Sequence, residues 1–235
     1  MDENTRLEIF RAQTTNVREL QSAWAQINRQ LNSCILTKNV VGVEVNTKLL
    51  ALVYCAFSEA LFSKLLHTPH GLALAQISQI KSAVDSNGIK SGWQKCAELG
   101  MQRVQSNKSS HSQNVRKKLS ELIDRFIFDP SLVRNKLAHG QWRIALNREN
   151  SALNLELSKE IEACNVVELY RRKHALDKLA AILEDIIESP NRTHHRDYWV
   201  HLTALEEEQR KMSRWTFEEK AIQLFKKRSY AQRVH

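Results

Sequence analysis

One short run in this chain of 235 residues combines residue types that suit acid–base chemistry on a phosphate: Arg134-Asn135-Lys136-Leu137-Ala138-His139-Gly140. An unperturbed histidine titrates at about pH 6.5, so it can accept or donate a proton in neutral solution. An arginine offers a planar fork of N–H donors that matches a phosphate and stabilises charge on it. Cleavage of RNA can proceed with these two functions and no metal, because RNA carries its own nucleophile, the 2′-hydroxyl.

The spacing within the run leaves two interpretations open. If both residues are helical, Arg134 and His139 lie about 140° apart around the helix, so they do not share one face. A composite site, in which a second subunit supplies the other half, would bring such residues together. The structural alternative is that Arg134 forms a salt bridge and His139 caps the helix C-terminus. Spacing alone favours this alternative, since Arg and His occur this close by chance.

The residues around the run predict the elements that position it. Asp129-Pro130 pairs a good N-cap with the residue favoured at the first helical position, so a helix of about ten residues should start there. Gly140 fits a left-handed C-terminal cap. Residues 141–157 then alternate between apolar and polar side chains around Asn147-Arg148-Glu149-Asn150, which predicts a β-hairpin.

Apolar residues at helical spacing predict that most of the remaining chain is helical. The expected helices are 4–32, 46–67, 72–84, 91–105, 113–128 and 165–189, followed by an amphipathic tail over 196–230. Between them we expect an extended link over 36–45, a turn at Asn87-Gly88 and a mobile loop over 106–112. Asn46 or Thr47 is the expected cap of the second helix, and Asn165 that of the last. Residues 1–190 should form one domain, with 191–235 as a C-terminal helical extension packed on it.

Composition narrows the class of protein. The net charge of +9 at pH 7 favours a polyanionic partner such as nucleic acid, and only 6 glycines and 3 prolines favour long helices. The four cysteines are far apart, so neither a disulfide framework nor a zinc site is expected, and no cofactor is implied. The polar start of the chain and the lack of about 18 unbroken apolar residues favour a cytoplasmic protein without membrane contact.

The full run resembles the signature of the HEPN superfamily: an arginine, a polar residue that is often asparagine, three further residues and a histidine. The resemblance covers about residues 1–190. It implies an all-α HEPN-like helical bundle, here with the small hairpin at about 141–157. It also implies a metal-independent endoribonuclease that is active as a homodimer through the motif-bearing face. Members occur in toxin–antitoxin and antiviral defence systems, so a regulatory partner such as an antitoxin is a further expectation.

Within this resemblance, Arg134 and His139 are the catalytic candidates and Asn135 is the supporting polar position. Lys136 is expected to contact the RNA strand. Glu59 is a second supporting candidate, because a charge on the apolar second helix is costly unless it is paired. We weigh equally that Glu59 orients Arg134 and that it forms a purely structural salt bridge.

Two other classes of function remain open from the sequence. The first is a non-catalytic HEPN module that binds RNA or a partner protein. The second is a structural helical protein in which the run is an accident. A nuclease predicts toxicity on expression that His139→Ala abolishes, whereas a structural protein predicts that Arg134 and His139 lie far from any cleft or interface.

Overall fold

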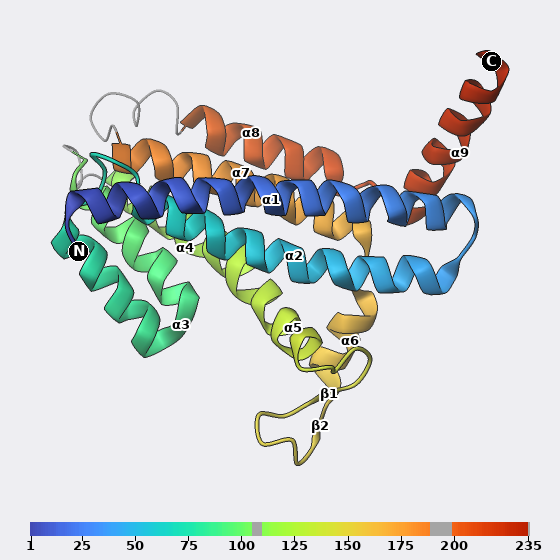
Figure 1. Ribbon diagram of the computed structural model, residues 1–235, viewed down its shortest axis with the longest axis horizontal. Coiled ribbons are helices and arrows are strands. Elements are labelled where there is room, and N and C mark those ends of the chain that lie inside the picture. Colours follow the sequence, from blue (N-terminus) through green and yellow to red (C-terminus); the bar gives the residue numbers. More distant parts are fainter. Residues whose placement is uncertain (105–109, 189–198, 235) are drawn as a thin grey trace.

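The computed structural model describes residues 1–104, 110–188 and 199–234, and these form an almost entirely helical protein (Figure 1). The first two helices, α1 (Glu3–Leu36) and α2 (Val40–Leu66), run antiparallel along each other. The extended link expected over 36–45 is wrong, as are the caps expected at Asn46 and Thr47. The Asn39 side chain instead caps α2 by accepting a hydrogen bond from Gly42 N at 2.9 Å. Packing along α1 outweighs the weak helix propensity of the valines.

The helix α3 (Leu74–Gln102) contains the predicted turn at Asn87-Gly88. Gly88 has φ +80° and ψ 179°, a conformation that interrupts the helix and that only glycine adopts readily. The two helices expected around this turn are therefore confirmed as the two halves of α3. Of the loop expected over 106–112, residues 106–109 lie outside the described residues, and 110–112 already belong to the next helix.

Three helical segments follow one another without a loop and end in the Arg134–His139 run: α4 (Ser110–Ile123), the π-helical turn η1 (Asp124–Phe128) and α5 (Asp129–Ala138). Asp129 is not an N-cap, because its backbone is helical and its N–H donates to the Asp124 carbonyl five residues earlier. Pro130 has no N–H for the Phe126 carbonyl, and the buried Tyr54 hydroxyl of α2 donates to that oxygen at 2.6 Å. Pro130 therefore fits inside a continuous helical segment, and α5 has the expected length of ten residues.

The hairpin after the run is smaller than expected. Its strands are β1 (Ala145–Leu146) and β2 (Leu153–Asn154), paired antiparallel. Residues 155–157 were assigned to the hairpin, which is wrong, since they begin the unpredicted helix α6 (Leu155–Ala163). Asn154 ends the strand and starts this helix by accepting a hydrogen bond from Leu157 N at 3.0 Å.

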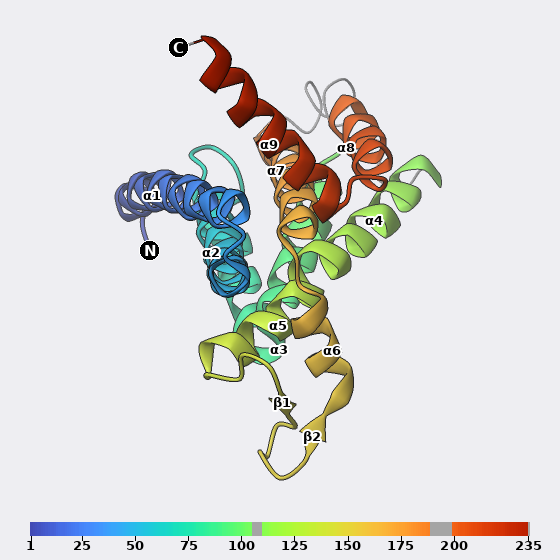
Figure 2. The same ribbon diagram turned by 90° about the vertical axis from the view of Figure 1, so that its right-hand side faces the viewer.

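The central helix α7 (Val166–Glu188) starts at the predicted cap, with Asn165 Oδ1 accepting from Glu168 N at 3.0 Å. It packs between the α1–α2 pair and α8 (Trp199–Met212), as Figures 1 and 2 show. The last helix, α9 (Phe217–Val234), begins against α7 and then projects from the body. One core joins the helices, and α7 contributes Leu176, Leu179, Leu183, Ile186 and Ile187 to it. Its largest fully buried side chains come from the chain before α5: Trp93, Tyr54, Phe57, Phe126, Leu31, Leu50, Leu72, Ile77, Ile80, Met101 and Leu119.

One helix of the described chain, α2, is long and apolar enough to cross a bilayer by length and composition alone. Half of its most apolar window is buried inside the protein, where α2 packs against α1, α5 and α7. The core of a folded protein imposes the same apolar composition on a central helix.

Candidate functional site

The chain turns sharply after α5, and this turn fixes the backbone of His139. The N–H of Gly140 donates to the Leu137 carbonyl at 3.2 Å, and that of Gln141 donates to the Lys136 carbonyl at 2.9 Å. These two bonds form a Schellman motif, and Gly140 adopts the left-handed conformation it requires, with φ +78°. The predicted glycine cap is confirmed, and His139 is the C-cap residue of α5.

Arg134 is held by the helix that packs beside it. Its guanidinium Nη2 donates to the carboxylate Oε1 of Glu59 on α2, so the sequence paired the right residues. The premise for that pairing is wrong, however, because the Glu59 side chain is 48% exposed and does not lie in the core. The Arg134 side chain is 31% exposed, so the ion pair lies at the surface and within reach of a ligand.

A second α2 side chain lies against Arg134. Cys55 is buried, and its thiol donates to the Pro130 carbonyl at 3.6 Å. Burial raises the pKa of this thiol to about 11, against the smaller opposing effect of the nearby Arg134 charge. Cys55 therefore stays protonated and neutral at physiological pH, and it packs beside the guanidinium without competing for its charge. Cys55 was not assigned to the site from the sequence; it lies four residues, one helical turn, before Glu59 on the same side of α2.

The remaining candidates lie on the open side of α5. Asn135 and His139 are exposed and Lys136 is half-buried. Among the described residues, none forms a hydrogen bond or an ion pair with the His139 imidazole. Because every residue up to Ala138 is helical, the rotation of about 140° between Arg134 and His139 is retained. One chain thus presents a fixed arginine and an unengaged histidine on different sides of the same helix end.

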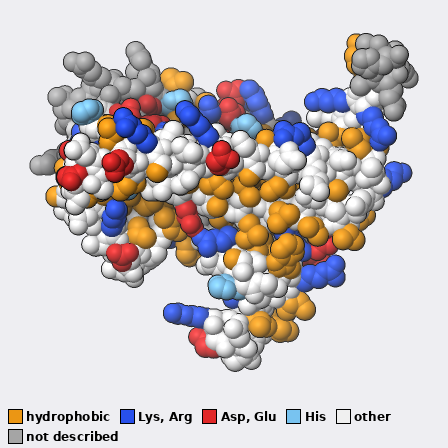
Figure 3. Space-filling view, in the orientation of Figure 1, with side chains coloured by type: hydrophobic (Ala, Val, Ile, Leu, Met, Phe, Trp, Pro, Cys, Tyr) orange, Lys and Arg blue, Asp and Glu red, His pale blue; other side chains and the backbone are white. Residues whose placement is uncertain are grey.

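An apolar surface borders this helix end. Along α2 a stripe of exposed and half-buried apolar side chains recurs every three or four residues and leads to Glu59: Val41, Val45, Leu49, Leu52 and Ala56. Val41 is 70% exposed, and from α5 Leu132 adds a side chain that is 37% exposed. Figure 3 shows hydrophobic side chains gathered over α2 and the adjoining α5. We name this stripe the α2 apolar face. Large exposed apolar surfaces are typical of interaction sites.

No three His, Cys, Asp or Glu side chains in the described part of the chain come together as metal ligands. Searches against protein families, curated proteins and solved structures each found no match to this chain.

Proposed function

We propose that this protein is a HEPN-type, metal-independent endoribonuclease that works as a homodimer. The observation that carries the proposal is the fixed Arg134 at the side of α5, beside an unengaged His139 at its end. Its setting is the cytoplasm, in phage defence or a toxin–antitoxin pair, where an antitoxin or similar protein restrains it. These surroundings rest on the resemblance of residues 134–140 to the superfamily signature.

In the proposed reaction, one His139 imidazole takes the proton of a 2′-hydroxyl, and that oxygen attacks the adjacent phosphorus. The bond from phosphorus to the 5′-oxygen breaks, and the partner protomer's histidine protonates the leaving oxygen. Arg134 donates to the phosphate oxygens and stabilises the charge that develops on them. The products are a 2′,3′-cyclic phosphate and a 5′-hydroxyl. Asn135 and Lys136, on the open side of α5, contact the strand.

Dimerisation is proposed through the α2 apolar face. Arg134 and His139 lie on different sides of the helix end within one chain. A two-fold arrangement of two α5 helices would bring the Arg134 of one protomer close to the His139 of its partner. The α2 apolar face adjoins Glu59 and gives that arrangement an apolar surface to bury. The net charge of +9 favours association of the dimer with RNA.

The test is cleavage of an end-labelled RNA pool by purified protein with EDTA present. Arg134→Ala and His139→Ala are expected to abolish cleavage, and His174→Ala serves as a matched control because His174 is an exposed histidine on α7. Wild-type products should carry cyclic phosphate ends. Equal cleavage by all four proteins would mean contamination and would overturn the proposal.

The second candidate is a non-catalytic HEPN module that binds RNA or a partner protein. The Arg134–Glu59 ion pair favours it, since a guanidinium already paired with a carboxylate also suits a purely structural role. Absence of cleavage together with RNA binding that Lys136→Ala weakens would support this candidate.

A further inference from the structure

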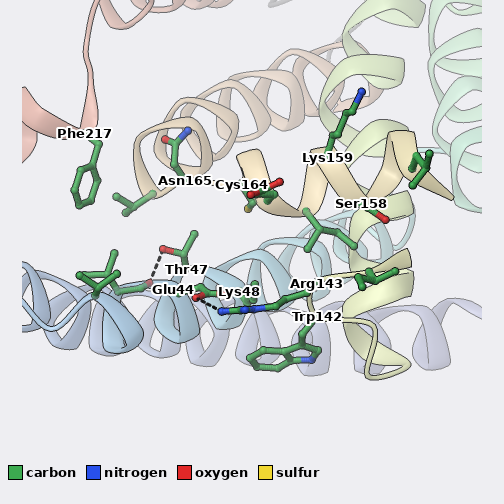
Figure 4. Close-up of a pocket in the computed structure, with 17 residues that line it drawn as sticks. Glu44, Thr47, Lys48, Trp142, Arg143, Ser158, Lys159, Cys164, Asn165 and Phe217 are labelled. Carbon is green, nitrogen blue, oxygen red and sulfur yellow. Dashed lines mark hydrogen bonds and ion pairs between the residues drawn. The ribbon is translucent and has the colours of Figure 1, made fainter. Parts of the chain in front are cut away.

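A cavity of about 730 Å³ opens next to the run and is not used by the proposed reaction. It is bounded by the first half of α2, residues 142–144, α6, the start of α7 and the first residue of α9. Figure 4 shows Trp142 and Phe217 at opposite ends of it, with the Arg143 side chain beside Glu44 and Lys48 of α2. Its volume is in the range of roughly 300–1,000 Å³ of small-molecule sites.

The cavity is rigidly connected to His139. Trp142 follows His139 by three residues, a separation of at most about 10 Å. The Schellman motif fixes the intervening backbone, and Trp142 Nε1 donates to the Leu137 carbonyl of α5 at 3.0 Å. A strand whose phosphate lies at His139 therefore has its neighbouring nucleotide within reach of the cavity.

The lining suits a planar ring. The half-buried ring of Trp142 offers stacking surface at the end of the cavity next to the run, and Phe217 lies at the other end. Ile144 and Leu155 line the same cavity and are 59% and 64% exposed, so a ring bound there covers apolar area that now faces water.

The rim suits a phosphate. Glu44 is bound most closely by Lys48, whose hydrogen bond holds the pKa of the Glu44 carboxyl below its ordinary value. Arg143 has only a 3.5 Å contact with the same carboxylate, and its side chain is 81% exposed. Such an exposed pair is weak, so the Arg143 guanidinium is available to an anion. Lys159 also lines the cavity from α6, but Figure 4 shows its amine directed away from Arg143.

We propose that this cavity binds a nucleotide of the RNA strand next to the scissile phosphate, with its base against Trp142 and its phosphate at Arg143. The proposal rests on the proposed function for its choice of ligand. Base–aromatic stacking is sequence-tolerant but favours some bases, so the cavity also biases where the enzyme cuts.

The test uses Ile144→Glu, which places a negative charge at the cavity, and Leu153→Glu as its matched control. Leu153 is 60% exposed on β2 and does not line the cavity. Both are introduced into His139→Ala protein, and binding of a labelled single-stranded RNA of mixed sequence is measured. Ile144→Glu is expected to weaken binding about fivefold or more, the effect of losing one stacked base, and Leu153→Glu to leave it unchanged. Ultraviolet cross-linking with mass spectrometry should locate the RNA on residues 142–144.

Four further outcomes separate the possibilities. Cross-links in the cavity without any cleavage by the wild type would retain the cavity and overturn the nuclease. Cleavage by the wild type with equal RNA affinity for both glutamate variants would retain the nuclease and overturn the cavity. If Ile144→Glu weakens binding of AMP or UMP but not of RNA, the ligand is a free nucleotide and the proposal fails. If Ile144→Glu changes only the oligomeric state, the cavity is occupied by a second protein chain and the proposal also fails.

Discussion

Glu59 on α2 and Arg134 on α5 are 75 positions apart in the sequence and form an ion pair in the fold. Because both side chains are partly exposed, Glu59→Gln should change the free energy of unfolding by less than about 1 kcal/mol. It should lower RNA cleavage by about tenfold to a hundredfold, since the guanidinium loses its fixed orientation toward the phosphate.

The control for this change is Glu98→Gln, which removes the exposed Lys95–Glu98 pair on α3. Urea denaturation and cleavage rates are measured for both variants. Equal cleavage by the two would show that Glu59 forms only a structural salt bridge.

Dimerisation through the α2 apolar face is tested by Val45→Lys, because Val45 is 38% exposed in a single chain. A charge buried between two copies of this face is costly, so the wild type should have twice the 27.2 kDa chain mass and the variant the mass of one chain. Cleavage should be lost with the dimer. Ile222→Lys, at an apolar position of α9 that is 52% exposed, should remain dimeric. Light scattering after size exclusion measures all three, and a monomeric, active wild type would exclude the composite site.

Gly140 allows a comparison of stability with activity. Gly140→Ala places a side chain at φ +78°, which should cost about 1–2 kcal/mol, although no atom lies near the added Cβ. Gly88→Ala, at φ +80° in α3, should cost at least as much, because its ψ of 179° belongs to a region that is essentially reserved for glycine. Only Gly140→Ala should also reduce cleavage, because only that turn positions His139. If both variants lose cleavage to the same extent, the loss is explained by general destabilisation and not by the position of His139.

The buried His67 makes stability depend on pH. Burial lowers the pKa of its imidazole, and the nearby Lys81 and Arg6 charges lower it further, against the hydrogen bond with the Ser63 carbonyl. The unfolded chain therefore binds more protons than the folded one just below about pH 6.5, so the free energy of unfolding falls as the pH drops through that value.

His67→Gln should flatten this dependence, whereas His174→Gln, at an exposed position of α7, should leave it in place. Urea unfolding at a series of pH values measures both slopes. An unchanged slope in His67→Gln would assign the pH dependence to other groups.

Local patterns predicted the elements that local interactions determine. The Asn165 cap, the Gly140 cap and the turn at Gly88 each depend on residues within one helical turn, and each is confirmed. The predicted start of α2 was wrong because its valines locally favour an extended conformation. The long packing contact between α2 and α1 stabilises the helical conformation instead, and the sequence of this segment alone does not reveal that contact. The helical conformation of residues 155–157 was missed because Leu153, Leu155 and Leu157 alternate as in a strand.

The site was predicted in part for the same reason. The Glu59–Arg134 pair was predicted because an unpaired charge in the core is costly. The two partners are right, but the expected burial of Glu59 is wrong. The contact of Cys55 with Arg134 and the cavity beside Trp142 join segments from several helices. No spacing within one segment records such contacts.

The π turn η1 sets an angular offset between two stretches of helix. Each residue of a helix advances the chain by about 100°, and a π turn holds one residue more than an α-helical turn. Deleting one residue from Asp124–Phe128 would convert the π turn into a regular α-helical turn. Arg134 would then be rotated about the helix axis by about a quarter of a revolution, away from Glu59, although every side chain of the run is unchanged. The arginine is therefore more sensitive to a change in the length of this turn than to most substitutions within it.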